Sequence, residues 1–173
     1  MSLSVSETTV AVFRDTLSNM RAWLDKPEVR ALEASLLEAR IAPDMYPLPR
    51  QYQIVSDTAK NAVARLTGTE APSMPDTEAS FDELQQRCDK TIAYLEGIDR
   101  AALDGSADRE VVIRFPNGMG YRFTGRQYVT GFVLPNFFFH ATTAYAILRA
   151  AGVPIGKPDF LQHLGPPNLQ PED

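Results

Sequence analysis

Apolar residues recur with a 3.6-residue period in three stretches of the first hundred residues, which predicts three amphipathic helices. The first begins near Ser4, where Ser4 and Glu7 have the spacing of a capping box. The second ends at Gly68, a good left-handed helix stop. The third starts at a second capping box, Ser80 and Glu83. The apolar positions of the three stretches are Val10, Phe13, Leu17, Met20 and Leu24; Leu48, Tyr52, Val55, Ala59, Ala62 and Leu66; and Phe81, Leu84, Cys88, Ile92 and Leu95.

Prolines interrupt this pattern between the first and second stretches. Pro27 lacks a backbone N–H, so the first helix is expected to break there, with helical character resuming over residues 27–38. Residues 42–50 hold three prolines and are expected to form a structured connection. Residues 69–79 have the composition of a loop, and a short turn over residues 99–104 is expected to close the third helix.

The pattern changes at Arg109. β-Branched and aromatic residues lie on both sides of a Pro-Asn-Gly turn at residues 116–118, which predicts a short β-hairpin. The next stretch ends at Gly152 and is apolar almost all the way round over residues 128–150. It therefore predicts a helix that neighbouring elements enclose on several sides.

Four long helices joined by long loops, with one hairpin before the last helix, predict an all-α fold of the four-helix-bundle type. A length of 173 residues fits one domain, so residues 1–173 are expected to form a single bundle domain. In the tail, Phe160 and Leu161 are expected to dock onto the bundle, and residues 165–173 are expected to be disordered.

Composition limits the partners. The net charge is -5 and the basic residues form no cluster, so nucleic acid is not expected as a partner. The N-terminus does not have the pattern of a signal peptide, and no uninterrupted apolar run has the length of a membrane span. We therefore expect a cytoplasmic protein that does not enter the membrane. Cys88 is the single cysteine; its core position favours a packed thiol over a nucleophile.

Two polar side chains interrupt the apolar surface of the predicted last helix. Asn136 and His140 are four residues apart, so they share one face. Pro135 presses on the carbonyl of Gly131, four residues earlier, so the helix is expected to bend there and leave that carbonyl without its usual partner. The bend can form the floor of a pocket in which His140 acts as a general base, or the two side chains can satisfy buried backbone groups in a structural network.

Candidate metal ligands are few. A zinc site with an open position needs at least three protein ligands. If a metal is bound, the candidates are His140 with Asn136 and Asp44, whose carboxylate suits a harder cation than zinc. Asp44 has a second interpretation as the cap of the second helix. The polar residues of that helix are expected to be mostly solvated; they are Gln51, Gln53, Asp57 and Asn61.

Two stretches resemble a known family. They are LLEARIAPDMYPLPRQYQIVSDTAKNAVARLTG, residues 36–68, and LPNFFFHATTAYAILRAAGVPIGKPDFL, residues 134–161. They are similar to a family of uncharacterised bacterial proteins within the DinB/YfiT-like superfamily, and the resemblance covers roughly residues 5–162. It implies a four-helix bundle with up-down-down-up topology and a homodimer formed through helix faces.

The same resemblance bears on metal binding. Many members of the superfamily hold a divalent ion, typically nickel or zinc, on three histidines, one from the start of the second helix and a His-x-x-x-His pair on the last. In this chain Asn136 and His140 stand at the two positions of the His-x-x-x-His pair. The region of Asp44, Gln51 and Gln53 has no histidine. Only one of the three histidines therefore has a counterpart.

Three hypotheses of function follow. The first is a homodimeric small-molecule-binding bundle with a degenerate, metal-free polar site lined by Asp44, Gln51, Gln53, Asn136 and His140. The second is a divalent-metal-dependent hydrolase or thiol transferase, as in some superfamily members, with zinc or nickel as cofactor. The third is a purely structural dimer. No serine–histidine–acid arrangement, phosphate loop or His-Glu-x-x-His motif is present, so whether the protein is an enzyme stays open.

Overall fold

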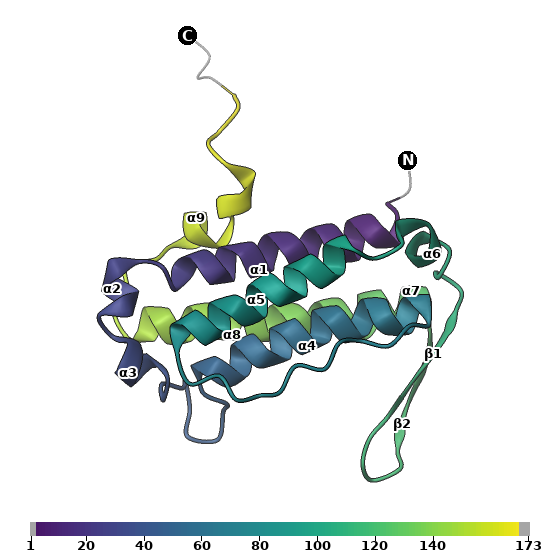
Figure 1. Cartoon of the computed structure of the whole chain (residues 1–173), viewed down its shortest axis with the longest axis horizontal. Helices are drawn as coiled ribbons and strands as arrows, with labels where there is room; N and C mark the ends of the chain where they lie inside the picture. Colours follow the sequence, from purple (N-terminus) through teal and green to yellow (C-terminus); the bar gives the residue numbers. More distant parts are fainter. Residues whose placement is uncertain (1–2, 170–173) are drawn as a thin grey trace.

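Four long helical segments lie side by side in the computed structural model, which describes residues 3–169 (Figure 1). The segments are η1 (Glu7–Ala11) with α1 (Val12–Trp23), α4 (Leu48–Thr67), α5 (Phe81–Glu96), and the continuous run of α7 (Gly125–Tyr128), η2 (Val129–Val133) and α8 (Leu134–Ala150). The shorter helices are α2 (Pro27–Arg30), α3 (Glu33–Leu36), α6 (Arg100–Asp104), α9 (Lys157–Phe160) and η3 (Gln162–Leu164). The predicted all-α bundle with one hairpin is confirmed.

The loop between α4 and α5 sets the topology. Residues 69–79 return along the length of the bundle, so α4 and α5 run in the same direction while α1 and α8 run in the opposite one (Figure 1). This is the up-down-down-up order. The core between the four helices is built from apolar stripes, and the Phe13 ring of α1 lies 4.6 Å from the Phe137 ring of α8.

The ends of the helices follow local sequence signals. The Glu7 N–H donates to Ser4 Oγ and the Ser4 N–H donates to Glu7 Oε2, so the first capping box is confirmed. At the third long helix the Glu83 N–H donates to Ser80 Oγ, but the Glu83 carboxylate accepts from the N–H of Ala79. In the second capping box, the Glu83 carboxylate therefore bonds to the N–H of the residue before Ser80 and not to the N–H of Ser80 itself.

Other helix boundaries were predicted in part. Gly68 ends α4 with φ of 74°, as expected for a left-handed stop. Residues 27–38 contain two separate short helices, α2 and α3, instead of one helical stretch. The turn expected over residues 99–104 is the short helix α6, which Asp99 caps by accepting from the N–H of Ala101.

The hairpin consists of β1 (Glu110–Arg114) and β2 (Gly120–Thr124), paired antiparallel with Val112 opposite Arg122. Past the last helix, the Phe160 ring packs against Trp23 and Tyr145 at 5.6 and 5.8 Å, so its docking is confirmed, while Leu161 stays 38% exposed. Of the tail expected to be disordered, residues 165–169 are exposed and residues 170–173 lie outside the described part.

The last helix widens just before Pro135. Over η2 the backbone forms a π-helical turn, in which the Leu134 N–H donates to the carbonyl of Val129, five residues earlier. Pro135 was expected to disturb the helix at this place, and a widened turn is one way a helix accommodates such a disturbance. No helix within residues 3–169 combines the length and hydropathy needed to cross a membrane.

Candidate functional site

His140 of α8 and Gln51 of α4 meet between the two helices. His140 Nδ1 lies 2.7 Å from Gln51 Oε1, and Gln51 Nε2 donates to the carbonyl oxygen of Tyr46 at 2.9 Å. Because the amide nitrogen is the donor to Tyr46, the amide oxygen must be an acceptor, so Nδ1 of His140 carries the proton. Nε2 then has a free lone pair, and among residues 3–169 no side chain or backbone group donates to it.

The surroundings of His140 favour a neutral ring. The side chain is half-buried, and burial lowers the pKa of His140 below its ordinary value of 6.5, with a further lowering from the positive charge of Arg50. At neutral pH the ring is therefore an uncharged imidazole. It can accept a hydrogen bond or a proton at Nε2. The second of these is what the general-base hypothesis requires.

A second uncharged contact joins the same helices. Asn136, one turn before His140, donates from Nδ2 to Thr58 Oγ1 at 2.9 Å, and Asn136 is half-buried. Thr58 follows Gln51 by two helical turns on the same side of α4. We call these four residues, Gln51, Thr58, Asn136 and His140, the α4–α8 seam. The predicted shared face of Asn136 and His140 is confirmed, and it looks toward the first half of α4.

Gln53 lies away from the seam. Its Nε2 donates to Glu78 at 2.9 Å and its Oε1 accepts from Arg50 at 3.1 Å. Residues two apart on a helix point about 200° apart, so Gln51 and Gln53 cannot face the same neighbour. The expected solvation of these side chains is also wrong, because Gln51 is 1% and Gln53 is 5% exposed.

Asp44 takes no part in the contacts of the seam. It lies exposed in a turn, and the N-cap position of α4 is Pro47, with no side-chain capping bond. The predicted capping role of Asp44 is therefore wrong, because the helix starts three residues later than a cap at Asp44 requires. The proline at the cap position has a side chain that cannot accept a hydrogen bond.

The seam is a poor match for the three-histidine metal site. One imidazole is present, its Nδ1 is bonded to an amide, and Asn136 is bonded to Thr58. Amide oxygens are weak ligands for zinc or nickel. Within residues 3–169, no three His, Cys, Asp or Glu side chains are grouped as metal ligands would be. The residues present at His140 do not fit a zinc or nickel ion of the superfamily kind.

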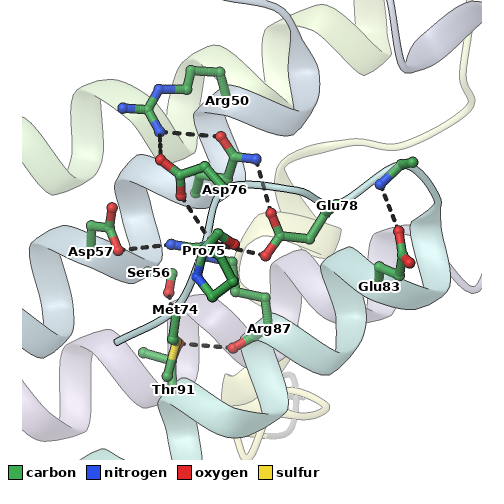
Figure 2. A network of polar contacts seen from close by, with 12 residues as sticks. Arg50, Ser56, Asp57, Met74, Pro75, Asp76, Glu78, Glu83, Arg87 and Thr91 are labelled. Atoms are coloured by element: carbon green, nitrogen blue, oxygen red, sulfur yellow. Dashed lines mark hydrogen bonds and ion pairs between the residues drawn. The ribbon is translucent and has the colours of Figure 1, made fainter. Parts of the chain in front are cut away.

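A charged network lies on another side of α4. The side chain of Arg87, from α5, is only 2% exposed and donates to Asp57 at 2.7 Å and to Glu78 at 2.8 Å, with Asp76 at 3.1 Å (Figure 2). It also donates to the carbonyl of Pro75 at 3.2 Å. Since these partners come from α4 and from residues 69–79, Arg87 fixes the long loop to the bundle.

Sequence reasoning missed this network, although a signal was present. Arg87 lies three residues after Leu84 and four before Thr91, so it belongs to the inward stripe of α5. A cation inside an apolar stripe must be paired with carboxylates to be stable there. The neighbouring Cys88 fits its prediction as a packed thiol, because burial raises the pKa of Cys88 to about 12.

The comparisons with known proteins agree on the fold. The family described as "Domain of unknown function (DUF1993)" matches residues 5–161 of the chain. The chain is also similar to the crystal structure of a DinB family member protein from Shewanella denitrificans. The identity is 37%, the similarity covers 96% of this chain and 95% of that chain, and the TM-score is 0.81. Among curated proteins, none matches the chain.

Proposed function

The chain belongs to the family described as a domain of unknown function, DUF1993, and we propose that it is a small-molecule-binding bundle whose ligand bonds to His140 without a metal ion. The 2.7 Å contact between His140 Nδ1 and Gln51 Oε1 carries the proposal. It orients the ring, and the bond from Gln51 to Tyr46 fixes which nitrogen is protonated. The result is a preorganised acceptor, Nε2, on a neutral ring in a half-buried setting.

The chemistry of this acceptor selects a class of ligand. A neutral imidazole nitrogen bonds to an O–H, N–H or S–H group, and the positive charge of Arg50 disfavours a cationic donor nearby. The ligand is therefore a neutral or anionic small molecule that presents one donor hydrogen to His140. Asn136 lies one turn away and offers its amide oxygen and its second N–H, because the bond to Thr58 uses only one hydrogen of its nitrogen.

The proposed protonation state can be measured directly. The chain has two histidines, so a His163→Gln variant leaves one set of imidazole signals. Nitrogen-15 NMR at pH 7.5 should find His140 neutral, with the proton on Nδ1. A Gln51→Leu variant should lose the bias toward this tautomer. A protonated ring, or a proton on Nε2, would remove the basis for the proposed ligand class.

Binding is tested with pairs of probes. Small alcohols, thiols and amides are screened by thermal shift, each beside a methylated analogue that lacks the donor hydrogen. A ligand at a hundred times its Kd should stabilise the fold by about 2.7 kcal/mol. The gain should vanish for the methylated analogue and for His140→Phe, whereas the matched control His163→Phe should keep it. Equal binding by His140→Phe contradicts the proposal.

Metal analysis separates this function from the hydrolase or transferase alternative. Protein purified without a histidine tag should carry no tightly held divalent ion. About one zinc or nickel ion per chain, lost in His140→Ala, would overturn the metal-free site and favour the metal-dependent enzyme. If the screen finds no ligand and His140→Gln keeps wild-type stability, the purely structural dimer is favoured.

We propose that the protein is a homodimer, and the outer face of α8 supports this. The chain has no charged residue between Arg126 and Arg149, and Phe138 and Phe139 are 37% and 57% exposed within that stretch. An uncharged, partly aromatic helix face is typical of a surface that a partner covers. Two copies of one face pack through a twofold axis.

Sizing at low micromolar concentration tests the dimer. The wild-type chain should elute at twice its 19.2 kDa mass, and Phe139→Glu should elute as a monomer. Met119→Glu changes an exposed side chain of the hairpin, 67% accessible, and should leave the dimer intact. A monomeric wild type contradicts this part of the proposal and leaves the ligand site untouched.

A further inference from the structure

A cavity of about 460 Å³ lies at the end of the bundle away from His140. Its walls include Thr8 from the first helix, Asp104 from α6, and Arg126 and Thr130 from the last helical run. Figure 1 shows the N-terminal end of the first helix, α6 and α7 at one end of the bundle, and α2 and α3, which lead toward the start of α4, at the other. The volume is within the range of known ligand pockets, about 300–1,000 Å³.

Both long helices that border this cavity are widened there. Thr8 belongs to the π-helical segment η1, and Val129 and Thr130 belong to the π-helical segment η2. These are the two π-helical segments of the described residues. Single π turns inside α-helices occur frequently at functional sites. Only η2 has a proline nearby to account for it, so the widening of η1 has no such local cause.

The cavity carries one charge of each sign. The carboxylate of Asp104 accepts from the N–H and the hydroxyl of Ser6 at 2.7 and 3.1 Å, and these bonds lower the pKa of Asp104. It is therefore fixed and ionised. Arg126 forms no salt bridge within residues 3–169, although its backbone is held by a bond from its N–H to Ala107. A guanidinium and a carboxylate thus line one cavity without pairing with each other.

Between the charges, the walls are apolar with three hydroxyls, those of Ser4, Thr8 and Thr130. Val5 and Val129 supply the apolar surface. The hydroxyl of Thr8 donates to the carbonyls of Ser4 and Val5, and that of Thr130 donates to the carbonyl of Arg126. Since the hydroxyl hydrogens of both threonines are used, each threonine oxygen can only accept from a ligand. Acceptor oxygens beside a carboxylate suit an ammonium group.

We propose that this cavity binds a small zwitterion, an amine and a carboxylate on an apolar body, with the ammonium at Asp104 and the carboxylate at Arg126. A guanidinium binds carboxylates through charge-assisted bonds, and the valines contact the apolar body. The site is separate from the seam of His140, so it stands whether or not the function proposed there is correct.

Matched probes test the proposal by isothermal titration calorimetry with the full chain. 6-Aminohexanoate is compared with hexanoate and hexylamine, and L-leucine with 4-methylpentanoate and 3-methylbutylamine. The two zwitterions differ in the distance between their charges. At least one should bind about tenfold or more tightly than both of its singly charged analogues. Equal affinity within each set, or no binding by either zwitterion, overturns the proposal.

A variant assigns the binding to Arg126. Arg126→Gln should reduce the affinity for the zwitterion about tenfold and bring it to that of the amine analogue. Lys90→Gln removes the same charge from an exposed position on α5 and should bind as the wild type does. Unchanged affinity in Arg126→Gln contradicts the site.

Amide NMR separates this inference from the function proposed at His140. The zwitterion should shift the amide signals of Thr8 and Thr130 and leave those of Gln51 and His140 in place. Shifts confined to Gln51 and His140 would move the binding to the seam and overturn the inference while supporting the other proposal.

Discussion

Helix α4 has two polar sides that differ in charge. Toward α8 it makes two uncharged contacts, Gln51 with His140 and Thr58 with Asn136. On another side, toward α5 and residues 69–79, it joins a network of Arg87 with three carboxylates, those of Asp57, Asp76 and Glu78 (Figure 2). A buried charge that loses its partner costs far more than a buried amide does. The charged side is therefore suited to fixing a loop, and the uncharged side can keep a spare acceptor for a ligand.

The largest expected effect is on the charged side. Arg87→Met keeps the volume of the side chain, removes the cation that pairs with Glu78, and leaves Asp57 and Asp76 with only their second cations, Lys60 and Arg50. The free energy of unfolding, measured in urea, should fall by about 3 kcal/mol. Arg122→Met breaks the exposed pair with Glu110 and should change stability by less than about 0.5 kcal/mol. A loss below about 1 kcal/mol for Arg87→Met would contradict the expectation that the buried charged contacts stabilise the fold more than the uncharged ones.

A smaller loss is expected on the uncharged side. Gln51→Leu leaves Nδ1 of His140 and the carbonyl of Tyr46 without their partner, so stability should fall by about 1–2 kcal/mol. Gln53→Leu, two residues away, should also destabilise, but the NMR signals of the His140 ring should stay as in the wild type. If both glutamine variants change the tautomer of His140, the two sides of α4 are not independent.

Loss of the contact between Thr58 and Asn136 should lower stability by a smaller amount still. Thr58→Val and Asn136→Leu should each lower the free energy of unfolding by about 1 kcal/mol. The double variant should lose less than the sum, because neither polar group is then left without its partner. Strictly additive losses would indicate that the two side chains do not interact.

The smallest effect concerns pH. The folded-state pKa of His140 lies below 6.5 because of burial and Arg50, so the unfolded chain binds a proton that the folded chain does not. This part of the stability is present above pH 6.5 and is lost as pH falls toward the lower folded-state pKa. His140→Gln should flatten the fall in stability below about pH 6.5, and His163→Gln should not. An unchanged profile in His140→Gln would contradict the neutral ring.

The candidate site could be predicted only in part. The shared face of Asn136 and His140 followed from their spacing of four, and the structure bears it out. Gln51 and Gln53 were assigned to one site although a spacing of two separates them around the helix. Asp44 was placed near the helix start, but α4 begins beyond it at Leu48. Neither Thr58 nor the Arg87 network was found from the sequence.

The sequence by itself determined the elements. Apolar periodicity, the Ser4 and Ser80 caps, the stop at Gly68 and the hairpin turn are signals within a few residues of where they act, and they predicted the helices and the hairpin. Only the tertiary structure decided which neighbour each polar side chain meets. That depends on the helices and the loop that flank α4, which lie far apart in the sequence. For this reason His140 has an amide partner from α4, while Gln53, on the same helix as that amide, belongs to the charged network.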